Sequence, residues 1–170
     1  GTIPLYEFDS LSYNFVEQNG DIFFFANDGV HGSEMWTSDG TVAGTTMVVD
    51  LNQGSAHGVA SLQNGLFVYG NKIFFPGDDG TTGFELWSSD GTAAGTALVK
   101  DINSGAAGSN PYGFQTFNGK LYFSSVNAEL WESDGSSAGT VSVNSNYDFS
   151  YGGMVVNGHL MYVINDAGTY

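Results

Sequence analysis

Residues 85–103 have the sequence ELWSSDGTAAGTALVKDIN, and two further stretches of the chain follow the same pattern. Residues 34–52 are EMWTSDGTVAGTTMVVDLN, and residues 129–140 are ELWESDGSSAGT. The tryptophans of the three copies lie 51 and 44 residues apart. Because blades of β-propellers repeat every ~40 to 50 residues, this spacing predicts one blade for each copy.

Turn residues divide each copy into four short strands. Dipeptides of Asn and Gly accept the positive φ angles of a two-residue hairpin, and they recur at Asn19-Gly20, Gly70-Asn71, Asn118-Gly119 and Asn157-Gly158. A second hairpin, the tryptophan strand, a Ser-Asp-Gly turn and an apolar strand follow. Along the tryptophan strand, Glu85 and Trp87 share one face. The predicted fold class is all-β, a β-propeller-like array of four-stranded antiparallel blades, with about four repeats of which the terminal ones are incomplete, and no helix.

The chain is predicted to be one repeat domain over residues 1–170, because its length allows a single core of ordinary size. A strand at 1–9 ends a repeat, and further repeats span about 14–52, 64–103, 114–146 and, in part, 153–170. Two interpretations of the ends stay open. Either the first strand completes the last blade and closes a four-bladed ring, which removes an exposed sheet edge, or the chain is a segment of a longer array.

The charge of the chain excludes two classes of partner. It has three basic residues, all lysine, against eighteen acidic ones, for a formal net charge of −15. Nucleic acids and anionic membrane surfaces both require Lys and Arg, so neither is expected as a partner. Apolar runs are of strand length, which predicts no membrane insertion, and the absence of cysteine excludes disulfides and thiolate chemistry. An acidic surface favours cations or neutral ligands.

The three motif copies carry a resemblance to a known family. The pattern Glu-Leu-Trp-x-Ser-Asp-Gly-Thr-x-Ala-Gly-Thr resembles the ELWxxDGT repeat of bacterial exoproteins. The match is strongest at 85–103, good at 34–52 and weaker at 129–140, where Ser136 replaces Thr. The resemblance implies propeller-like β-structure and an extracellular or cell-surface location. It implies no catalytic or binding residues.

The repeated motif residues are predicted to be structural. The tryptophans could stack on sugars, but repetition at one strand position favours core packing. The glutamates lack the asymmetry of a two-carboxylate hydrolase, and we expect them to accept backbone N–H groups from an adjacent loop. The aspartates that precede Gly are expected to bond their own turn backbone rather than calcium. These residues are Glu34, Trp36, Asp39, Glu85, Trp87, Asp90, Glu129, Trp131 and Asp134.

Ligand and metal candidates lie outside the motif. Aromatic residues in the linking segments are the candidate ligand-binding residues: Tyr112, Phe114, Tyr147 and Tyr151. A second acidic position recurs in the other hairpin, at Asp28, Asp78 and Asp79, and is the candidate site for weak calcium binding. No cofactor other than calcium is expected. The three histidines, His31, His57 and His159, fall in different loop types and predict no shared metal site.

The motif repeats the same residue types in each copy and does not provide two chemically different groups for catalysis. Two functional hypotheses follow. The first is a non-catalytic, secreted or cell-surface structural or adhesion module whose partners are other surface or matrix proteins, further repeats or copies of itself. The second is a lectin-like module that binds neutral glycans, with or without calcium. The chain is not expected to be an enzyme, because no nucleophile motif or acid pair is present.

Overall fold

A computed structural model describes residues 6–60, 65–126, 129–144 and 153–162 of the chain. These residues form fourteen β-strands, every observed strand pairing is antiparallel, and no α-helix occurs among them. The predicted all-β class is therefore confirmed. Within the same ranges, no helix is both long enough and apolar enough to cross a membrane.

Twelve of the strands form three four-stranded sheets in which strand order follows the sequence. Sheet I contains β1 (Ser10–Gln18), β2 (Asp21–Asn27), β3 (Ser33–Ser38) and β4 (Thr46–Val49). Sheet II contains β5 (Phe67–Tyr69), β6 (Lys72–Gly77), β7 (Glu85–Ser89) and β8 (Ala97–Lys100). Sheet III contains β9 (Tyr112–Phe117), β10 (Lys120–Ser124), β11 (Leu130–Ser133) and β12 (Val141–Asn144). Sheet IV is the pair β13 (Gly153–Val156) and β14 (His159–Tyr162).

The first hairpin of each sheet turns at the Asn-Gly positions that the sequence indicated. Asn19, Asn118 and Asn157 adopt φ angles of 57°, 48° and 50°, and the glycine after each is also at positive φ. In sheet II the order of the two residues is reversed, and Gly70 takes the positive angle, at 63°. Asn and Gly tolerate this left-handed conformation better than other residues, so the four predicted hairpins are confirmed.

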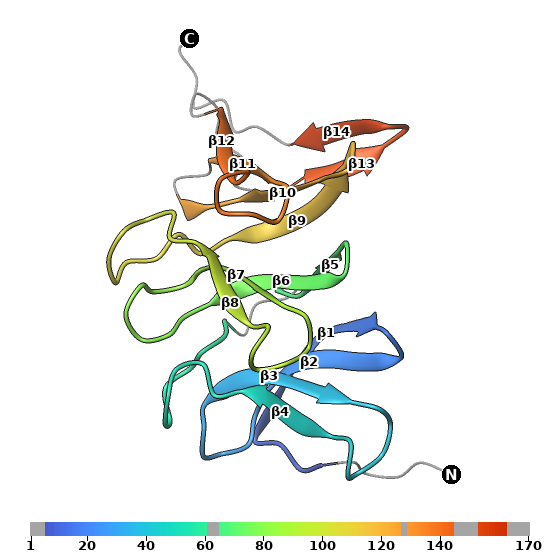
Figure 1. The fold of residues 1–170 in the computed structure, drawn as a ribbon, viewed down its shortest axis with the longest axis vertical. Coiled ribbons are helices and arrows are strands. Elements are labelled where there is room, and N and C mark those ends of the chain that lie inside the picture. Colours follow the sequence, from blue (N-terminus) through green and yellow to red (C-terminus); the bar gives the residue numbers. More distant parts are fainter. Residues whose placement is uncertain (1–5, 61–64, 127–128, 145–152, 163–170) are drawn as a thin grey trace.

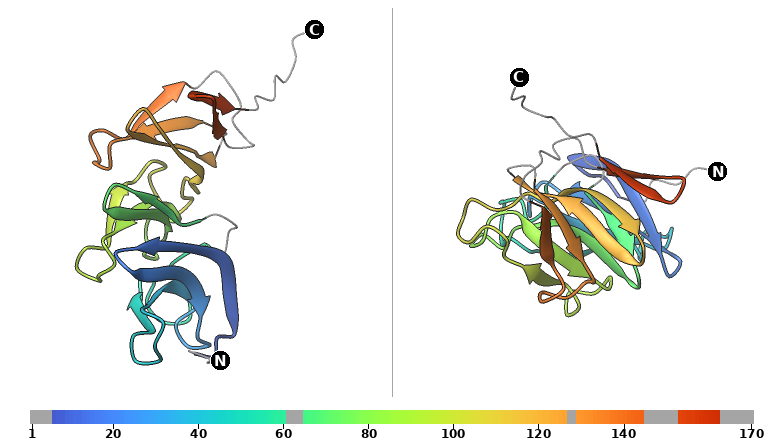
Figure 2. Two further views of the ribbon diagram at one scale, coloured as in Figure 1. Left: turned by 90° about the vertical axis from the view of Figure 1, so that its right-hand side faces the viewer. Right: turned by 90° about the horizontal axis from the view of Figure 1, so that it is seen from above.

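The sheets stack along the long axis of the molecule (Figures 1 and 2). Because alternate residues of a strand face opposite sides, sheet II contributes to two cores. One core joins sheets I and II and contains Phe23, Phe25, Met35, Ile73, Phe75 and Trp87. The next joins sheets II and III and contains Phe74, Leu86, Val99, Phe114, Leu121 and Phe123. The first strands of successive sheets meet, as β1 with β5, β5 with β9 and β9 with β13.

The stack is open in the part of the chain that the structure describes. Sheet I lies at one end of the long axis and sheet IV at the other, so these residues do not form the four-bladed ring that one interpretation of the ends required (Figure 1). The arrangement of the sheets as blades around a propeller axis therefore stays a prediction.

Residues 6–9 lie against sheet I without forming a strand. Phe8 packs on Trp36 with ring centroids 4.9 Å apart, and the Asp9 N–H donates to the Asn27 carbonyl at 2.8 Å. Leu51 and Ile102, which follow β4 and β8, pack in the same way into the cores that contain Trp87 and Trp131. Phe8 thus packs on sheet I in the same way that Leu51, which follows sheet I, packs on sheet II. Residues 1–5 of the predicted strand lie outside the described residues.

Candidate functional site

Two motif glutamates hold the loops that leave their own sheets. The Glu34 carboxylate accepts the N–H groups of Leu51, at 3.1 Å, and Gly58, at 2.8 Å. Glu85 accepts those of Ile102, at 2.9 Å, and Asn103, at 3.0 Å. Both side chains are fully buried, and these bonds compensate for the lost water. The predicted acceptor role is confirmed for this pair; residues 145–152, which follow β12 in the copy of Glu129, are outside the described ranges.

Burial also changes the acidity of Glu34. It raises the pKa of this carboxyl to about 7, against the lowering effect of the N–H groups of Leu51, Gly58 and Asn52. The nearby Asp50 charge acts in the same direction as burial. Glu34 is therefore a structural acid that changes its charge near neutral pH.

Trp87 and Trp131 pack between sheets, as predicted, whereas Trp36 lies on the outer face of sheet I and is covered there by Phe8. Trp36 and Trp87 are 5% and 7% exposed. Trp131 is half-buried against the core of sheets II and III, with its ring 6.4 Å from that of Phe123 and its Nε1–H donated to the Ser125 hydroxyl. The indole faces of Trp36 and Trp87 are therefore not open platforms for a sugar ring.

The aspartates that precede Gly bond their own turns. Asp39 Oδ1 accepts the backbone N–H and the hydroxyl of Thr41, at 2.8 and 2.7 Å. The Thr45 hydroxyl then donates to the Thr41 carbonyl and lies 2.7 Å from the Ser38 hydroxyl. The same bonds recur around Asp90 and Asp134. The side-chain bond lowers the pKa of each of these aspartates, and the predicted turn-capping role is confirmed.

The candidate calcium ligands are also engaged in turns. Asp28 accepts the N–H groups of Val30 and His31, and its other oxygen lies 2.7 Å from the His31 ring. Burial alone would raise the pKa of Asp28, but these bonds outweigh it and hold the pKa at about 2. Asp78 and Asp79 bond the Gly80, Thr81 and Thr82 turn of sheet II in the equivalent way. The described residues contain no group of three acidic or histidine side chains that could hold a metal ion, so calcium binding stays a prediction without a site.

Phe114, one of the candidate ligand-binding residues, is a core residue in the structure. Phe114 is only 4% exposed and packs on Phe67 and Phe123, because β9 begins at Tyr112 and turns Phe114 toward the core. The prediction that Phe114 lies in a linking segment is therefore wrong. Tyr112 is half-buried at the start of the same strand. Tyr147 and Tyr151 lie outside the described residues.

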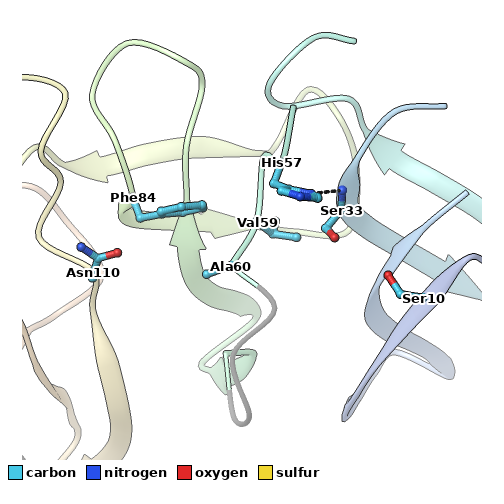
Figure 3. Close-up of a pocket in the computed structure, with 7 residues that line it drawn as sticks. All are labelled: Ser10, Ser33, His57, Val59, Ala60, Phe84 and Asn110. Atoms are coloured by element: carbon cyan, nitrogen blue, oxygen red, sulfur yellow. Dashed lines mark hydrogen bonds between the residues drawn. The ribbon is translucent and has the colours of Figure 1, made fainter. Parts of the chain in front are cut away.

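The structure instead assembles a pocket of about 540 Å³ between the sheets (Figure 3). It forms where the segments that connect sheets I to II and II to III meet the first residues of β1 and β3 and the residue just before β7. Phe84 and Asn110 lie on one side and Ser10 on the other (Figure 3). The pocket is lined by Ser10, Ser33, His57, Val59, Ala60, Phe84 and Asn110.

Backbone hydrogen bonds fix the two connecting segments. Gly58 and Val59 both donate to the Ser33 carbonyl at 3.1 Å, and Ser109 and Asn110 donate to the Phe84 carbonyl at 2.9 and 2.8 Å. Gly58 and Ser109 also bond the buried carboxylates of Glu34 and Glu85. The motif glutamates therefore position the pocket without lining it.

His57 has a defined orientation in the pocket. Its Nδ1 accepts the Ser33 backbone N–H at 2.9 Å (Figure 3). The proton of the neutral ring therefore lies on Nε2, where it can donate to a ligand. A carboxylate is not the partner of Nδ1, so His57 lacks the orienting acid of a Ser-His-Asp triad.

The pocket suits a small neutral molecule with an apolar face. Val59, Ala60 and Phe84 supply apolar surface, and the serines, His57 and Asn110 supply hydrogen-bonding groups. No charged carboxylate or ammonium group lines it. Sequence reasoning missed these residues, although there was a signal: Phe84 and Ser33 precede the motif glutamate in their copies, and they differ. A position where otherwise similar copies diverge is a candidate for recognition.

Comparison with known proteins adds no family to these observations. The chain matches no protein-family model, and a search of curated proteins found no match. The resemblance to the ELWxxDGT repeats rests on the residues of the three motif copies.

Proposed function

We propose that this chain is a non-catalytic structural or adhesion module of the ELWxxDGT type that acts at the cell surface or outside the cell. The observation that carries this proposal is the use of the repeated polar residues. Glu34, Glu85, Asp39 and Asp90 all bond backbone groups of their own sheet and its connecting segment. These repeated polar residues stabilise the sheets and their connecting segments. The exposed surfaces of the sheets are then the part of the chain that contacts surface or matrix proteins.

The sheets are propeller-like blades in this proposal. Each is a four-stranded antiparallel meander, and the first strand of each sheet meets the first strand of the next. Propeller blades have this topology, with their first strands nearest the central channel. Leu51 and Ile102 pack at the sheet junctions and Phe8 packs on sheet I in the equivalent position, which supports a repeating arrangement.

Retention on protein-coated surfaces tests the adhesion role. Microspheres coated with the chain are passed under flow over surfaces of collagen, fibronectin and envelope fragments, with microspheres coated with heat-unfolded chain as the control. We expect retention of the folded chain on at least one protein surface. Equal retention of folded and unfolded chain on every surface would contradict the proposal.

A lectin-like role is the second candidate, and the pocket in Figure 3 favours it. An aromatic ring beside hydroxyl, imidazole and amide groups matches the alternating apolar and hydroxyl surfaces of a neutral sugar. Because the pocket holds no carboxylate, this binding would not need calcium at that position.

A glycan array, run with calcium and with chelator, tests the second candidate. Phe84→Ser, which installs the residue of the first copy, should lower binding of any positive glycan by about tenfold or more. His159→Ala changes a histidine on β14, outside the pocket, and serves as the control. A glycan signal that survives Phe84→Ser unchanged would place recognition elsewhere.

A further inference from the structure

The outer face of sheet I is an apolar surface on which Tyr6 and Phe8 pack but which no other sheet of the described chain covers. We call it the Trp36 face. Phe24 and Trp36 form its buried floor, and a groove of about 280 Å³ runs beside them along Leu11, Phe15 and Ile22. Tyr6 and Phe15 are 46% and 47% exposed. Large aromatic side chains gathered in this way mark an interaction site more often than an ordinary surface.

Sheets II and III cover the equivalent positions. Ile73 in sheet II and Leu121 in sheet III occupy the place of Ile22, and both are fully buried, whereas Ile22 is 37% exposed. Ile73 is covered by the back of sheet I, through Phe25, Met35 and Val48. Leu121 is covered by the back of sheet II in the same manner. In both sheets, the face that corresponds to the Trp36 face is therefore covered by the back of the preceding sheet.

The opposite end of the stack presents such a back. Val143 of β12 holds the place of Val48 and Val99, which are 9% and 8% exposed between sheets, yet Val143 is 45% exposed. Sheet IV covers β9 through β13, and among the described residues it has no third or fourth strand to cover β12. At the same end of the stack, Met161 of β14 in sheet IV is also exposed, at 54%. We call this surface the Val143 face.

We propose that copies of this chain associate head to tail, with the Trp36 face of one copy receiving the Val143 face of the next. The contact continues the sheet-on-sheet packing that already joins sheets I to II and II to III. It is heterologous, so repetition gives a ring if the rotation closes and a filament if it does not. This inference deepens the proposed role in protein contacts, on which it rests, by naming the partner.

Charge predicts how this association responds to salt. The residues that define both faces are uncharged, while each copy carries a net charge of −15. Repulsion between acidic copies opposes association, and salt screens it without weakening apolar contacts. Association should therefore strengthen as the ionic strength rises from about 0.05 to 0.5 M. A contact made by ion pairs would respond in the opposite direction.

Sedimentation of the whole chain at concentrations up to about 100 µM tests the proposal, since this range detects contacts with Kd values near 0.1 mM. We expect concentration-dependent association of the natural chain. Phe15→Glu on one face and Val143→Glu on the other should each weaken it by about tenfold or more. Val30→Glu, at a 63% exposed position on the β2–β3 hairpin, is the matched control and should associate like the natural chain.

A mixture of the two variants separates head-to-tail association from other modes. Phe15→Glu keeps a functional Val143 face, and Val143→Glu keeps a functional Trp36 face, so the mixture should form a heterodimer that grows no further. Leu11→Glu, also at an exposed position of the groove, replaces Phe15→Glu if the latter loses its folded circular dichroism spectrum. A monomer at high salt, or normal association of Val143→Glu, would overturn the proposal. A monomer that is still retained on protein-coated surfaces would leave the proposed function intact and reject self-association alone.

Discussion

At the scale of single residues, the repeated acids of this chain act on the backbone. Glu34 lies fully buried and accepts two loop N–H groups, and Asp39 closes the turn after its strand. A buried acid that only holds a loop still couples stability to pH, because burial raises the pKa of Glu34 to about 7. The folded protein keeps the Glu34 proton at pH values where the unfolded chain has lost it.

The first prediction concerns this coupling. Since the folded-state pKa lies above the unfolded value of 4.5, the stability that Glu34 contributes below about pH 4.5 should be lost as pH rises through about 7. Relative to Glu34→Gln, which cannot ionise, the unfolding free energy of the natural chain should fall by on the order of 3 kcal/mol over that window. Urea unfolding of both proteins at several pH values measures the difference. Glu7→Gln, at an exposed position, is the control, and a natural chain that becomes more stable relative to Glu34→Gln as pH rises would contradict the prediction.

The second prediction concerns the glycine of the Ala-Gly-Thr sequence. A Cβ atom at Gly95 would overlap the Asp90 carboxylate, and the same holds for Gly44 with Asp39. Gly95→Ala should therefore destabilise the protein by roughly 1 to 3 kcal/mol. The cost should shrink in the Asp90→Ala background, because the overlapping group is gone. A double-mutant cycle by chemical unfolding measures this coupling, and strictly additive effects would show that the overlap is not the cause.

At the scale of elements, sheet packing explains why tryptophan recurs in the motif. Trp87 joins β7 of sheet II to the core shared with sheet I, and Gly77 on β6 leaves room for its indole ring. The sequence predicted this core role from the fixed strand position. The role of Phe114 could not be predicted in the same way, because it depended on where β9 begins, and a shift of one residue exchanges the core side of a strand for the solvent side.

The third prediction tests the sheet junction. Trp87→Ala should lower the unfolding free energy by about 3 to 5 kcal/mol, because it leaves a large cavity between sheets I and II. Val30→Ala, at a highly exposed position, should change stability by less than about 0.5 kcal/mol. Thermal or urea unfolding measures both. An equally small effect of Trp87→Ala would mean that the indole contributes little to the junction.

At the scale of the whole molecule, the sheets differ in how much of their surface is covered by neighbouring sheets. Both faces of sheet II are covered, one by sheet I and the other by sheet III. Sheet I leaves its Trp36 face exposed, and sheet III leaves β12 partly exposed. In a stack where each sheet contacts only its neighbours, stability depends on these shared faces.

The fourth prediction follows from this difference in how far the sheets are covered. Backbone amides of β6 and β7 should exchange with solvent more slowly than those of β1 and β12, because opening sheet II disrupts two cores. Hydrogen exchange followed by mass spectrometry of peptides measures this. If head-to-tail association occurs, raising the protein concentration should slow exchange in β2 and β3 as well. Slowest exchange in sheet III would contradict the predicted order.

The sequence by itself determined the features that arise within a few residues of the chain. Hairpin positions, turn capping by Asp39 and the alternation that buries Trp87 depend on local backbone angles and neighbours two to six residues away. Only the tertiary structure decided which faces remain uncovered and which residues line the pocket. Ser10, His57 and Asn110 come from three separate segments, and nothing local couples their positions. They meet because apolar packing between sheets, together with loops held by buried glutamates, places distant segments side by side.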